Sequence, residues 1–358
     1  MHAPTVVLGS GPAGSVCAHQ LALRGHDVLL TERRSSFRRR VGETCGPSVR
    51  RLLEGACGLS LPRSAYRPIT TISSAWGSNQ IDGRRFALWH ADDGFVLDRP
   101  VFDEWLLRSA EAAGVTILRG CRVINGRRHG AGWLVETQAD GCDRTLHAGF
   151  IVEATGRGAR SVVLPDVRTF ATDALACVSV ELNEQLCDSG AALVESCGAG
   201  WWYSVTLPND RHMLALFTDA DLIPPARGRR DWLNAVVDTT THIRKLSPLL
   251  REDVPIKVCG ARTSVRSILW RDTWTSIGDA AWSLDPLSGA GIERAVADGI
   301  QTAAAISRAL SDGDTEPLKA LALARANAFQ KSLVVQRRYY RAEKRWRNSA
   351  FWQRRHSY

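Results

Sequence analysis

The sequence predicts an α/β fold with a Rossmann-like nucleotide-binding domain, an antiparallel-sheet domain and a C-terminal helical tail. Three observations lead to this prediction. Residues 4–32 follow a strand–helix–strand pattern, residues 67–93 alternate polar and apolar side chains, and apolar side chains recur at helical spacing from Leu318 onward. The 358 residues are 44% hydrophobic, which is enough to build two lobes with cores of their own.

The strand–helix–strand unit carries a glycine-rich turn. A buried strand at residues 4–9 leads through Gly-Ser-Gly-Pro-Ala-Gly into a helix over 12–25, and a second strand covers 27–32. Glycines at these spacings allow a tight turn, the approach of a pyrophosphate and close helix–strand packing, while the helix N-terminus offers free N–H groups. Proline is tolerated there, and an acid ending the second strand can bind a ribose. The predicted dinucleotide site comprises Gly9, Gly11, Pro12, Ala13, Gly14, Glu32 and Arg33.

The segments that follow extend both lobes. Residues 120–150 read as a small antiparallel meander with turns at Asn125-Gly126 and Asp140-Gly141. Residues 174–220 contain several strand-like runs, such as Leu214–Phe217. The other predicted elements are helices at 101–113, 232–237 and 289–310 and strands at 115–118 and 275–277.

The nucleotide-binding domain is therefore expected to be discontinuous, with the second lobe inserted into it. A bound dinucleotide would lie along the carboxyl ends of the parallel strands. The predicted boundaries are residues 1–66, 94–166 and 256–312 for the nucleotide-binding domain, 67–93 and 167–255 for the substrate domain, and 313–358 for the C-terminal helical segment.

Positive charge is concentrated at the C-terminus. The chain has a net charge of +9, and residues 331–358 hold nine Lys or Arg against one acid, Glu343. Such a segment fits an anionic partner or a solvated helix. Its aromatic residues could stack on nucleic acid, but no nucleic-acid-binding fold accompanies them, so we expect no nucleic-acid partner. We expect these aromatics to pack on the protein body, with docking of an acidic leader or scaffold as the alternative.

The nine cysteines point to a reducing compartment. Their number is odd, their spacing is scattered and no C-x-x-C pair occurs, so we expect buried or half-buried reduced thiols, no disulfide framework and no metal site. No stretch approaches the roughly 20 apolar residues of a membrane span, and no signal peptide precedes the first strand. We expect a cytoplasmic protein that does not contact a membrane.

A second glycine turn follows the strand at residues 275–277. It reads Gly278-Asp279-Ala280-Ala281 and continues as Asp285-Pro286-Leu287-Ser288-Gly289-Ala290-Gly291. This run resembles the second fingerprint of FAD-dependent monooxygenases. The resemblance implies that FAD is the bound dinucleotide, that Asp279 binds its ribityl chain, and that the helix starting near Gly289 directs N–H groups at the flavin N1–C2 edge. Its predicted cofactor residues are Gly278, Asp279, Pro286, Gly289, Ala290 and Gly291.

Three further segments resemble parts of the same family. Ala154-Thr155-Gly156 is similar to a turn beside the cofactor, which implies that Gly156 contacts FAD. Arg99 matches an arginine that relatives place near the flavin, and Arg40 and Glu43 lie where relatives have a loop over the cofactor. For each arginine, an ordinary surface charge is the alternative.

The run from Gly200 to Leu207 narrows the resemblance. It is similar to the G-W-x-W-x-I-P-L signature of flavin-dependent halogenases, with Tyr203 in place of the second Trp and Thr206 in place of Pro. Halogenases use a lysine about 65 residues after the glycine turn, whereas the first lysine here is Lys245. The chain therefore looks most like halogenase-like flavoproteins that modify tryptophan in a peptide or protein, as in the maturation of lysine oxidase, glycine oxidase and quinohaemoprotein amine dehydrogenase.

This resemblance implies an FAD-dependent monooxygenase that hydroxylates an electron-rich aromatic ring through a flavin C4a-hydroperoxide. The expected substrate is a tryptophan or indole on a peptide or protein, or a small aromatic molecule. Trp76, Trp202 and Tyr203 are candidate walls of the substrate site, for which core packing is the alternative, and His90 is a candidate proton acceptor.

O2 would be the co-substrate, and electrons would come from NAD(P)H or a separate flavin reductase. The lack of a second nicotinamide fingerprint favours the reductase. Three alternatives stay open: halogenation, an FAD-dependent oxidase or reductase acting on a small metabolite, and a flavin-binding protein without catalytic activity.

Overall fold

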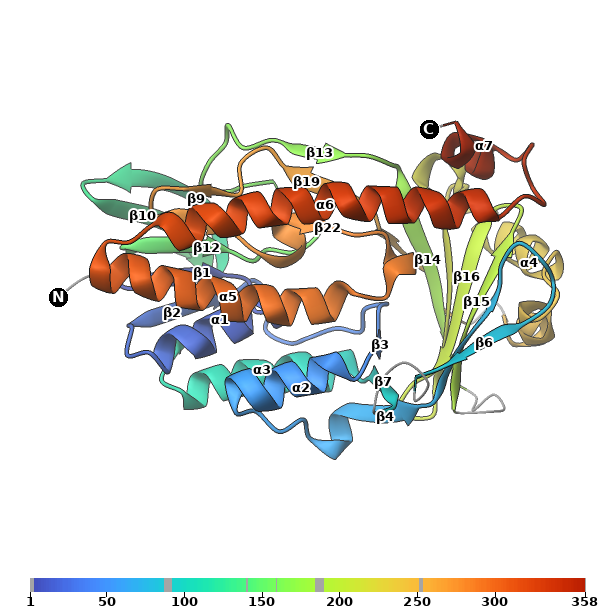
Figure 1. Ribbon diagram of the computed structural model, residues 1–358, viewed down its shortest axis with the longest axis horizontal. Helices are drawn as coiled ribbons and strands as arrows, with labels where there is room; N and C mark the ends of the chain where they lie inside the picture. Colours follow the sequence, from blue (N-terminus) through green and yellow to red (C-terminus); the bar gives the residue numbers. More distant parts are fainter. Residues whose placement is uncertain are drawn as a thin grey trace.

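The computed structural model has two lobes side by side along its long axis, and helix α6 runs across both of them (Figure 1). The first lobe contains a parallel sheet covered by helices, and the second is built on one large sheet. The structure describes residues 3–86, 92–139, 141–158, 160–183, 190–250 and 254–357. Among these residues, no helix combines the length and the apolar character needed to cross a bilayer.

The first lobe centres on a six-stranded sheet in the order β20-β21-β12-β1-β2-β8. The strands from β21 to β8 pair in parallel, and β20 pairs with β21 in antiparallel fashion. The predicted strand–helix–strand unit is present at the centre of this sheet. The bounds are β1 Thr5–Leu8, β2 Val28–Glu32, β8 Thr116–Arg119, β12 Phe150–Glu153, β20 Trp270–Arg271, β21 Trp274–Ser276, and helices α1 Pro12–Ala22, α2 Ser48–Cys57, α3 Arg99–Ala112 and α5 Gly291–Asp312.

Strand β1 is buried on both faces because each face meets a different layer. Val7 belongs to the core under helices α1, α3 and α5, whereas Val6 and Leu8 pack with Trp133 and Trp274 on the opposite side. Side chains alternate across a strand, so an unbroken apolar run fits a strand covered on both sides. This arrangement explains why Thr5–Leu8 carries no alternation of polar and apolar residues.

The predicted meander is a three-stranded antiparallel sheet, but one predicted turn is wrong. Asn125 and Gly126 lie inside β9 (Arg122–His129), and the chain reverses at residues 130–131 before β10 (Gly132–Ala139) and β11 (Cys142–Ala148). A Cβ at Gly126 would lie 3.0 Å from Val163, so this glycine allows close packing rather than a hairpin turn.

The second lobe is a seven-stranded sheet in the order β18-β14-β17-β16-β15-β5-β6. Its neighbours are antiparallel except for β15 and β5, which pair in parallel. Helix α4, Arg229–Asp238, covers one face of the sheet. The strands are β5 Thr71–Ala75, β6 Asp82–Arg85, β14 Leu175–Leu182, β15 Ala191–Cys197, β16 Gly200–Thr206, β17 His212–Asp219 and β18 Lys257–Gly260.

Two small three-stranded sheets lie beside these layers. The first has the order β3-β7-β4 and the second β13-β19-β22. Their bounds are β3 Thr44–Cys45, β4 Tyr66–Ile69, β7 Gly94–Leu97, β13 Thr169–Ala171, β19 Ser264–Arg266 and β22 Trp282–Ser283.

The C-terminal segment is helical, as predicted, and attaches to both lobes. It forms α6 (Glu316–Ala342) and α7 (Ala350–His356). Near the start of α6, the buried Arg325 side chain donates from Nε to Asp298 Oδ1 at 2.7 Å and from Nη1 to the Ser276 carbonyl at 3.2 Å. Asp298 Oδ2 accepts a hydrogen bond from Gly278 N at 2.7 Å. Helix α6 therefore braces the turn that follows β21.

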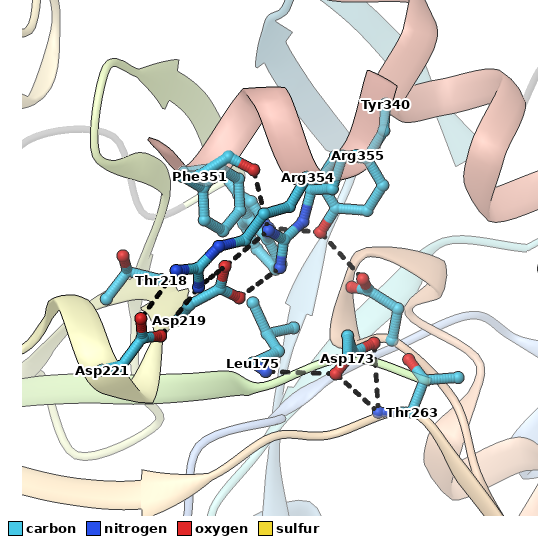
Figure 2. A network of polar contacts seen from close by, with 12 residues as sticks. Asp173, Leu175, Thr218, Asp219, Asp221, Thr263, Tyr340, Phe351, Arg354 and Arg355 are labelled. Atoms are coloured by element: carbon cyan, nitrogen blue, oxygen red, sulfur yellow. Dashed lines mark hydrogen bonds and ion pairs between the residues drawn. The ribbon is translucent and has the colours of Figure 1, made fainter. Parts of the chain in front are cut away.

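The far end of the tail binds the large sheet through charge (Figure 2). Arg355 Nη2 lies 2.8 Å from Asp219 Oδ1 at the end of β17, and Arg354 bridges Asp219 at 3.0 Å and Asp221 at 2.6 Å. Trp352 adds a hydrogen bond to the Cys197 carbonyl at 2.8 Å. The predicted packing of the tail aromatics on the body is therefore present in the structure.

The Arg325–Asp298 pair gives a stability prediction. Arg325→Met should lower the free energy of unfolding by about 3–5 kcal/mol, because it leaves the Asp298 carboxylate buried without its counter-charge. Arg308→Met removes an exposed ion pair with Asp314 and should cost less than about 1 kcal/mol. Urea unfolding of both variants measures the difference, and equal losses would contradict the bracing role.

Candidate cofactor site

The predicted site residues meet where neighbouring parallel strands end. Gly9 follows β1, Glu32 ends β2 and Gly278 follows β21. A Cβ at Gly9 would lie 2.6 Å from the carbonyl oxygen of Ala154, which follows β12, and one at Gly278 would lie 2.8 Å from Cβ of Ala13 in α1. The two glycine turns, about 270 residues apart in sequence, are therefore in direct contact.

Each glycine of the first turn has a distinct surrounding. Gly9 has φ +105°, and a Cβ on Gly14 would lie 1.9 Å from the Gly9 carbonyl oxygen, so both positions require glycine for packing. A Cβ on Gly11 would have no atom within 4 Å, and Gly11 has φ −68°. The space above Gly11 is therefore open at the N-terminus of α1, where Pro12 is the first helical residue.

Glu32 faces this turn with its carboxylate. Glu32 Oε2 accepts hydrogen bonds from Ser10 Oγ at 2.7 Å and Ser10 N at 3.2 Å, and Oε1 accepts from Arg34 N at 2.9 Å. The carboxylate is half-buried at the end of β2, beside the glycine turn, whereas Arg33 is exposed. This position suits binding of a ribose hydroxyl, as the spacing predicts.

Asp279 is flanked by two arginines. Its Oδ2 lies 3.3 Å from Arg157 Nη2, and its Oδ1 pairs with Arg294 of α5. Arg157 Nη1 also donates to the carbonyls of Ala261 at 2.7 Å and Leu284 at 2.9 Å. Arg157 follows the Ala154-Thr155-Gly156 turn, in which Gly156 has φ +80°. Arg157 therefore joins the turn after β12 to the turn after β21.

The loop that leads into α5 is anchored by side chains of the tail helix α6. Asp285 is buried, accepts from Leu287 N at 2.9 Å, and accepts from Tyr340 Oη and Gln336 Nε2 of α6 at 2.8 Å each. Burial raises the pKa of the Asp285 carboxyl. Pro286 opens a short 3₁₀ turn that ends at Gly289 with φ +61°.

Helix α5 begins at Gly291, two residues later than predicted. Ala290 is its N-cap residue, and a Cβ at Gly289 or Gly291 would meet no atom within 4 Å. This helix N-terminus therefore opens onto free space, as an amide-lined binding edge requires.

Glu43 lies in the same loop as Arg40, and Arg99 at the start of α3 contacts that loop. The buried Glu43 side chain accepts from Gly42 N at 2.8 Å, and burial raises the pKa of its carboxyl to about 7. Arg99, also buried, lies 3.1 Å from Asp103 and donates to the Gly42 carbonyl at 3.3 Å. Arg40 is exposed, and a small cavity beside it is lined by these side chains together with Arg39, Leu97, Asp98, Pro100 and Leu207.

The aromatic residues predicted to line the substrate site lie on both faces of the large sheet. Tyr203 Oη forms a hydrogen bond with Thr44 Oγ1 at 2.5 Å, so its face of β16 turns toward the cofactor lobe. Trp201 shares that face and stacks on Phe217 with centroids 4.0 Å apart. Trp202 points the other way, is fully buried and packs with Leu233 of α4. Trp202 is therefore a core residue and is not brought together with Tyr203.

Trp76 lies on the cofactor-facing side but is covered by the tail. Its indole Nε1 donates to the Tyr339 carbonyl at 2.9 Å, and its ring contacts Tyr340 and Trp352 edge to face, with centroids 6.0 and 5.5 Å apart. Next to it, the buried carboxylate of Glu343 accepts from Gly77 N at 2.7 Å and Ser196 Oγ at 2.6 Å. The remaining candidate, His90, lies outside the described residues.

Sequence reasoning missed the residues that position the site. Arg157 directly follows the Ala154-Thr155-Gly156 turn, so its position near the candidate site could have been inferred from that motif. Nothing in the sequence links Arg294, Asp298 or Arg325 to the second glycine turn, because their contacts join different elements. The expectation of buried or half-buried cysteines is also wrong for Cys142 and Cys259, which are exposed.

The described residues fit a dinucleotide cofactor. The first turn offers an open helix N-terminus above Gly11, the Glu32 carboxylate lies beside it, and the second turn presents Asp279 and the open start of α5. A ribose, a pyrophosphate and an electron-rich ring edge each have a chemically suitable partner here. The fold and this site define a Rossmann-type flavoprotein.

Comparison with known proteins identifies the family. A family model for FAD-dependent oxidoreductases matches residues 61–312, and one for NAD(P)-binding Rossmann-like domains matches residues 7–41. The chain belongs to the FAD-dependent oxidoreductase family. It is 28% identical to the putative FAD-dependent oxidoreductase LodB of Marinomonas mediterranea, over 99% of this chain and 96% of that protein.

Solved structures show the same fold. The myxobacterial chondrochloren halogenase CndH superposes with a TM-score of 0.85 at 24% identity, covering 98% of this chain and 85% of that one. The peptidyl tryptophan dihydroxylase QhpG, essential for tryptophylquinone cofactor biogenesis, gives a TM-score of 0.77 at 26% identity, with 99% and 79% coverage. The chain is thus similar both to flavin halogenases and to a flavoprotein that acts on peptidyl tryptophan.

The glycine surroundings predict opposite effects for two substitutions. Gly11→Ala should leave the stability of the apoprotein unchanged but weaken FAD binding about tenfold or more, because its Cβ would occupy the open space in which we predict the pyrophosphate. Gly14→Ala should destabilise the apoprotein, because its Cβ overlaps the Gly9 carbonyl. Thermal unfolding without cofactor and flavin fluorescence titration separate the two effects. Full FAD affinity in Gly11→Ala would contradict the assignment.

Glu43 predicts a pH-dependent stability. Its folded-state pKa of about 7 lies above the ordinary value of 4.5. The contribution of Glu43 to the free energy of unfolding is therefore fully present below pH 4.5 and is lost as the pH rises through 7. Glu43→Gln keeps the acceptor for Gly42 N and removes the titration. Relative to wild type, this variant should gain up to about 3 kcal/mol of apoprotein stability between pH 5 and pH 8.

Urea unfolding at several pH values measures this gain. Glu54→Gln, on an exposed position of α2, is the control and should run parallel to wild type. If the free energy of unfolding of Glu43→Gln also changes with pH as that of wild type does, the raised pKa is contradicted.

Proposed function

We propose that this protein is an FAD-dependent monooxygenase that hydroxylates an electron-rich aromatic ring, with a tryptophan carried on a peptide or protein as its substrate. The observation that carries the proposal is the junction of the two lobes, where Tyr203 reaches Thr44 of the cofactor lobe from the large sheet. Trp76 and Trp201 pack on the same face of the sheet, beneath the tail. The half-buried Tyr203 ring is the aromatic group at this junction that can stack on an indole. The similarity to QhpG, which acts on peptidyl tryptophan, supports the same class of substrate.

Halogenation is the second candidate, favoured by the structural similarity to CndH. The sequence argues against it, because no lysine precedes Lys245. The Ser73-Ser74-Ala75-Trp76-Gly77 run, which covers the end of β5 and the two residues after it, carries no ammonium group. A lysine amine is what the halogenase resemblance requires for handling hypohalous acid. Hydroxylation needs positioning and exclusion of water rather than such a group.

The residues of this chain would bind and orient the cofactor and the substrate and would shield them from water. Reduced FAD, when bound, supplies the chemistry that activates O2. The two glycine turns, Glu32 and Asp279 would hold the cofactor, and Tyr203 with Thr44 would fix the loop above it against the sheet. Glu43, whose carboxyl has a pKa of about 7, can hold or release a proton on its side chain near neutral pH.

We further propose that a separate flavin reductase supplies the electrons and that an acidic protein segment docks on the tail. The exposed side of α6 combines Leu323, Val334, Val335 and Tyr339 with basic residues. Exposed apolar side chains rimmed by positive charge suit an acidic amphipathic leader or scaffold. The exposed basic residues of α6 and of the segment that follows it, here called the tail patch, are Lys331, Arg337, Arg338, Arg341, Lys344 and Arg347.

Mass spectrometry of Trp-containing substrates tests this function. Acidic Trp-containing peptides, the same peptides with the acids neutralised, and free tryptophan are incubated with the FAD-loaded protein, a flavin reductase, NADH, O2 and chloride or bromide. We expect the acidic peptide to gain one or more oxygen atoms on tryptophan. A halogenated product, turnover without O2, or unchanged peptides throughout would overturn the proposal.

Charge reversal of the tail patch tests docking separately. Arg337→Glu with Arg338→Glu should raise KM for the acidic peptide several-fold at low salt and leave kcat unchanged, because exposed charges steer encounter rather than chemistry. Arg227→Glu with Arg244→Glu, at exposed positions away from the tail, is the matched control. An unchanged KM, or an equal rise in the control, would contradict docking on the tail patch.

A further inference from the structure

Two cysteines face each other across the edge of the large sheet. Cys177 of β14 is paired directly with Cys259 of β18, the edge strand, in an antiparallel ladder. The ladder continues past them, since Ala261 N donates to the Leu175 carbonyl at 2.8 Å. Residues directly opposite in such a ladder have Cα atoms about 4.5–5.5 Å apart, which lies within the range of disulfides, about 4.4–6.8 Å.

The two thiols differ in their access to solvent. Cys177 is 1% exposed and belongs to the core beside Trp201 and Tyr340, whereas Cys259 is exposed at the sheet edge. The two thiols interact with each other, which pairs the exposed sulfur with the buried one. This arrangement provides one thiol that a small oxidant can reach and a second one held directly against it.

We propose that Cys177 and Cys259 form a peroxide-reactive dithiol site, in which Cys259 is oxidised first and Cys177 resolves it to an intrachain disulfide. The ligand class is a small hydroperoxide, with hydrogen peroxide as the simplest member. Reduced flavoproteins that react with O2 in the absence of substrate are a source of this oxidant, and only this source of peroxide rests on the proposed function. The dithiol reaction itself does not depend on it.

The chemistry balances with one peroxide. The Cys259 thiolate attacks one peroxide oxygen, the O–O bond breaks, and the leaving hydroxide takes up the proton released from Cys259 to become water. The product is a sulfenic acid at Cys259. The Cys177 sulfur then attacks the Cys259 sulfur, an S–S bond forms, the S–O bond breaks, and the hydroxide leaves as water with the Cys177 proton. Two thiols lose two electrons, and one peroxide becomes two waters.

The surroundings favour this order of events. The hydrogen-bonding interaction with Cys177 lowers the pKa of the Cys259 thiol, partial burial opposes it, and the positive charge of Arg157 adds a smaller lowering effect. The pKa of Cys177 is raised by that hydrogen bond, by burial and by the charge of Glu43. The thiolate is the reactive form, so Cys259 is the nucleophile. Arg157 also binds the Ala261 carbonyl and Asp279, so the dithiol adjoins the candidate cofactor site.

The sheet meander supplies an internal control. Cys142 is the other exposed cysteine among the described residues, and the residue opposite it in the ladder is Ala139. It shares the solvent access of Cys259 but has no thiol across the strand. A reaction that depends on the paired thiols must therefore oxidise Cys259 faster than Cys142.

Peptide mapping tests the proposal on the full-length protein with oxidised FAD bound and no reductant present. Protein is treated with one equivalent of hydrogen peroxide, alkylated with iodoacetamide and digested. We expect a cross-linked pair of peptides containing Cys177 and Cys259, two hydrogens lighter and reversed by dithiothreitol, while Cys142 is still alkylated. Oxidation of Cys259 no faster than Cys142, or a disulfide to another cysteine, would overturn the proposal.

Variants separate the two roles. In Cys177→Ala, which keeps the core apolar, dimedone should trap a sulfenic acid on Cys259, and in Cys259→Ser, Cys177 should stay reduced. Cys142→Ser should leave the disulfide yield unchanged. In untreated wild type, alkylation of Cys259 should reach half its maximal rate at a pH below the ~8.5 of a free thiol, and Cys177→Ala should raise that pH. An unmoved midpoint would contradict the thiol pairing.

These readouts use added peroxide and no turnover. Failure of the hydroxylation experiment would leave them unaffected, and failure here would leave the proposed monooxygenase activity unaffected.

Discussion

The buried contact between Gly278 and Asp298 is the constraint on which the candidate cofactor site depends. Gly278 has φ +58° and lies against Ala13 of the first glycine turn, so its backbone must be held in one position. The Asp298 carboxylate does this from α5, and Arg325 of α6 neutralises it; both side chains are about 5% exposed. A buried carboxylate without this partner would be costly, which makes the tail helix part of the site.

The tail also fixes the large sheet relative to that site. Helix α6 carries Arg325 near its start and Tyr340 near its end, where the Tyr340 hydroxyl binds Asp285 in the loop before α5. The segment beyond it ends in Arg354 and Arg355, which pair with Asp219 of β17 (Figure 2). One continuous segment therefore contacts the second glycine turn, the loop before α5 and the large sheet.

The junction between the lobes combines aromatic and titratable groups. Tyr203 reaches Thr44 from the sheet side, and Glu43 is buried next to that contact with a raised pKa. Desolvation, rather than a neighbouring charge, is the main cause of that shift, so the groups at this junction are shielded from bulk water. A low-dielectric surface lined by aromatic rings is the environment in which a reactive oxygen species is protected from water.

The sequence by itself determined the strand–helix–strand unit, the glycine roles and the family, because these depend on spacing within short segments. It also showed the alternation of Trp201, Trp202 and Tyr203 along one strand. Only the tertiary structure decided which face of that strand meets the cofactor lobe, and it placed Trp202 in the opposite core. The partners Arg325 with Asp298 and Cys177 with Cys259 were likewise decided by packing, because contacts between elements far apart in sequence leave no local pattern.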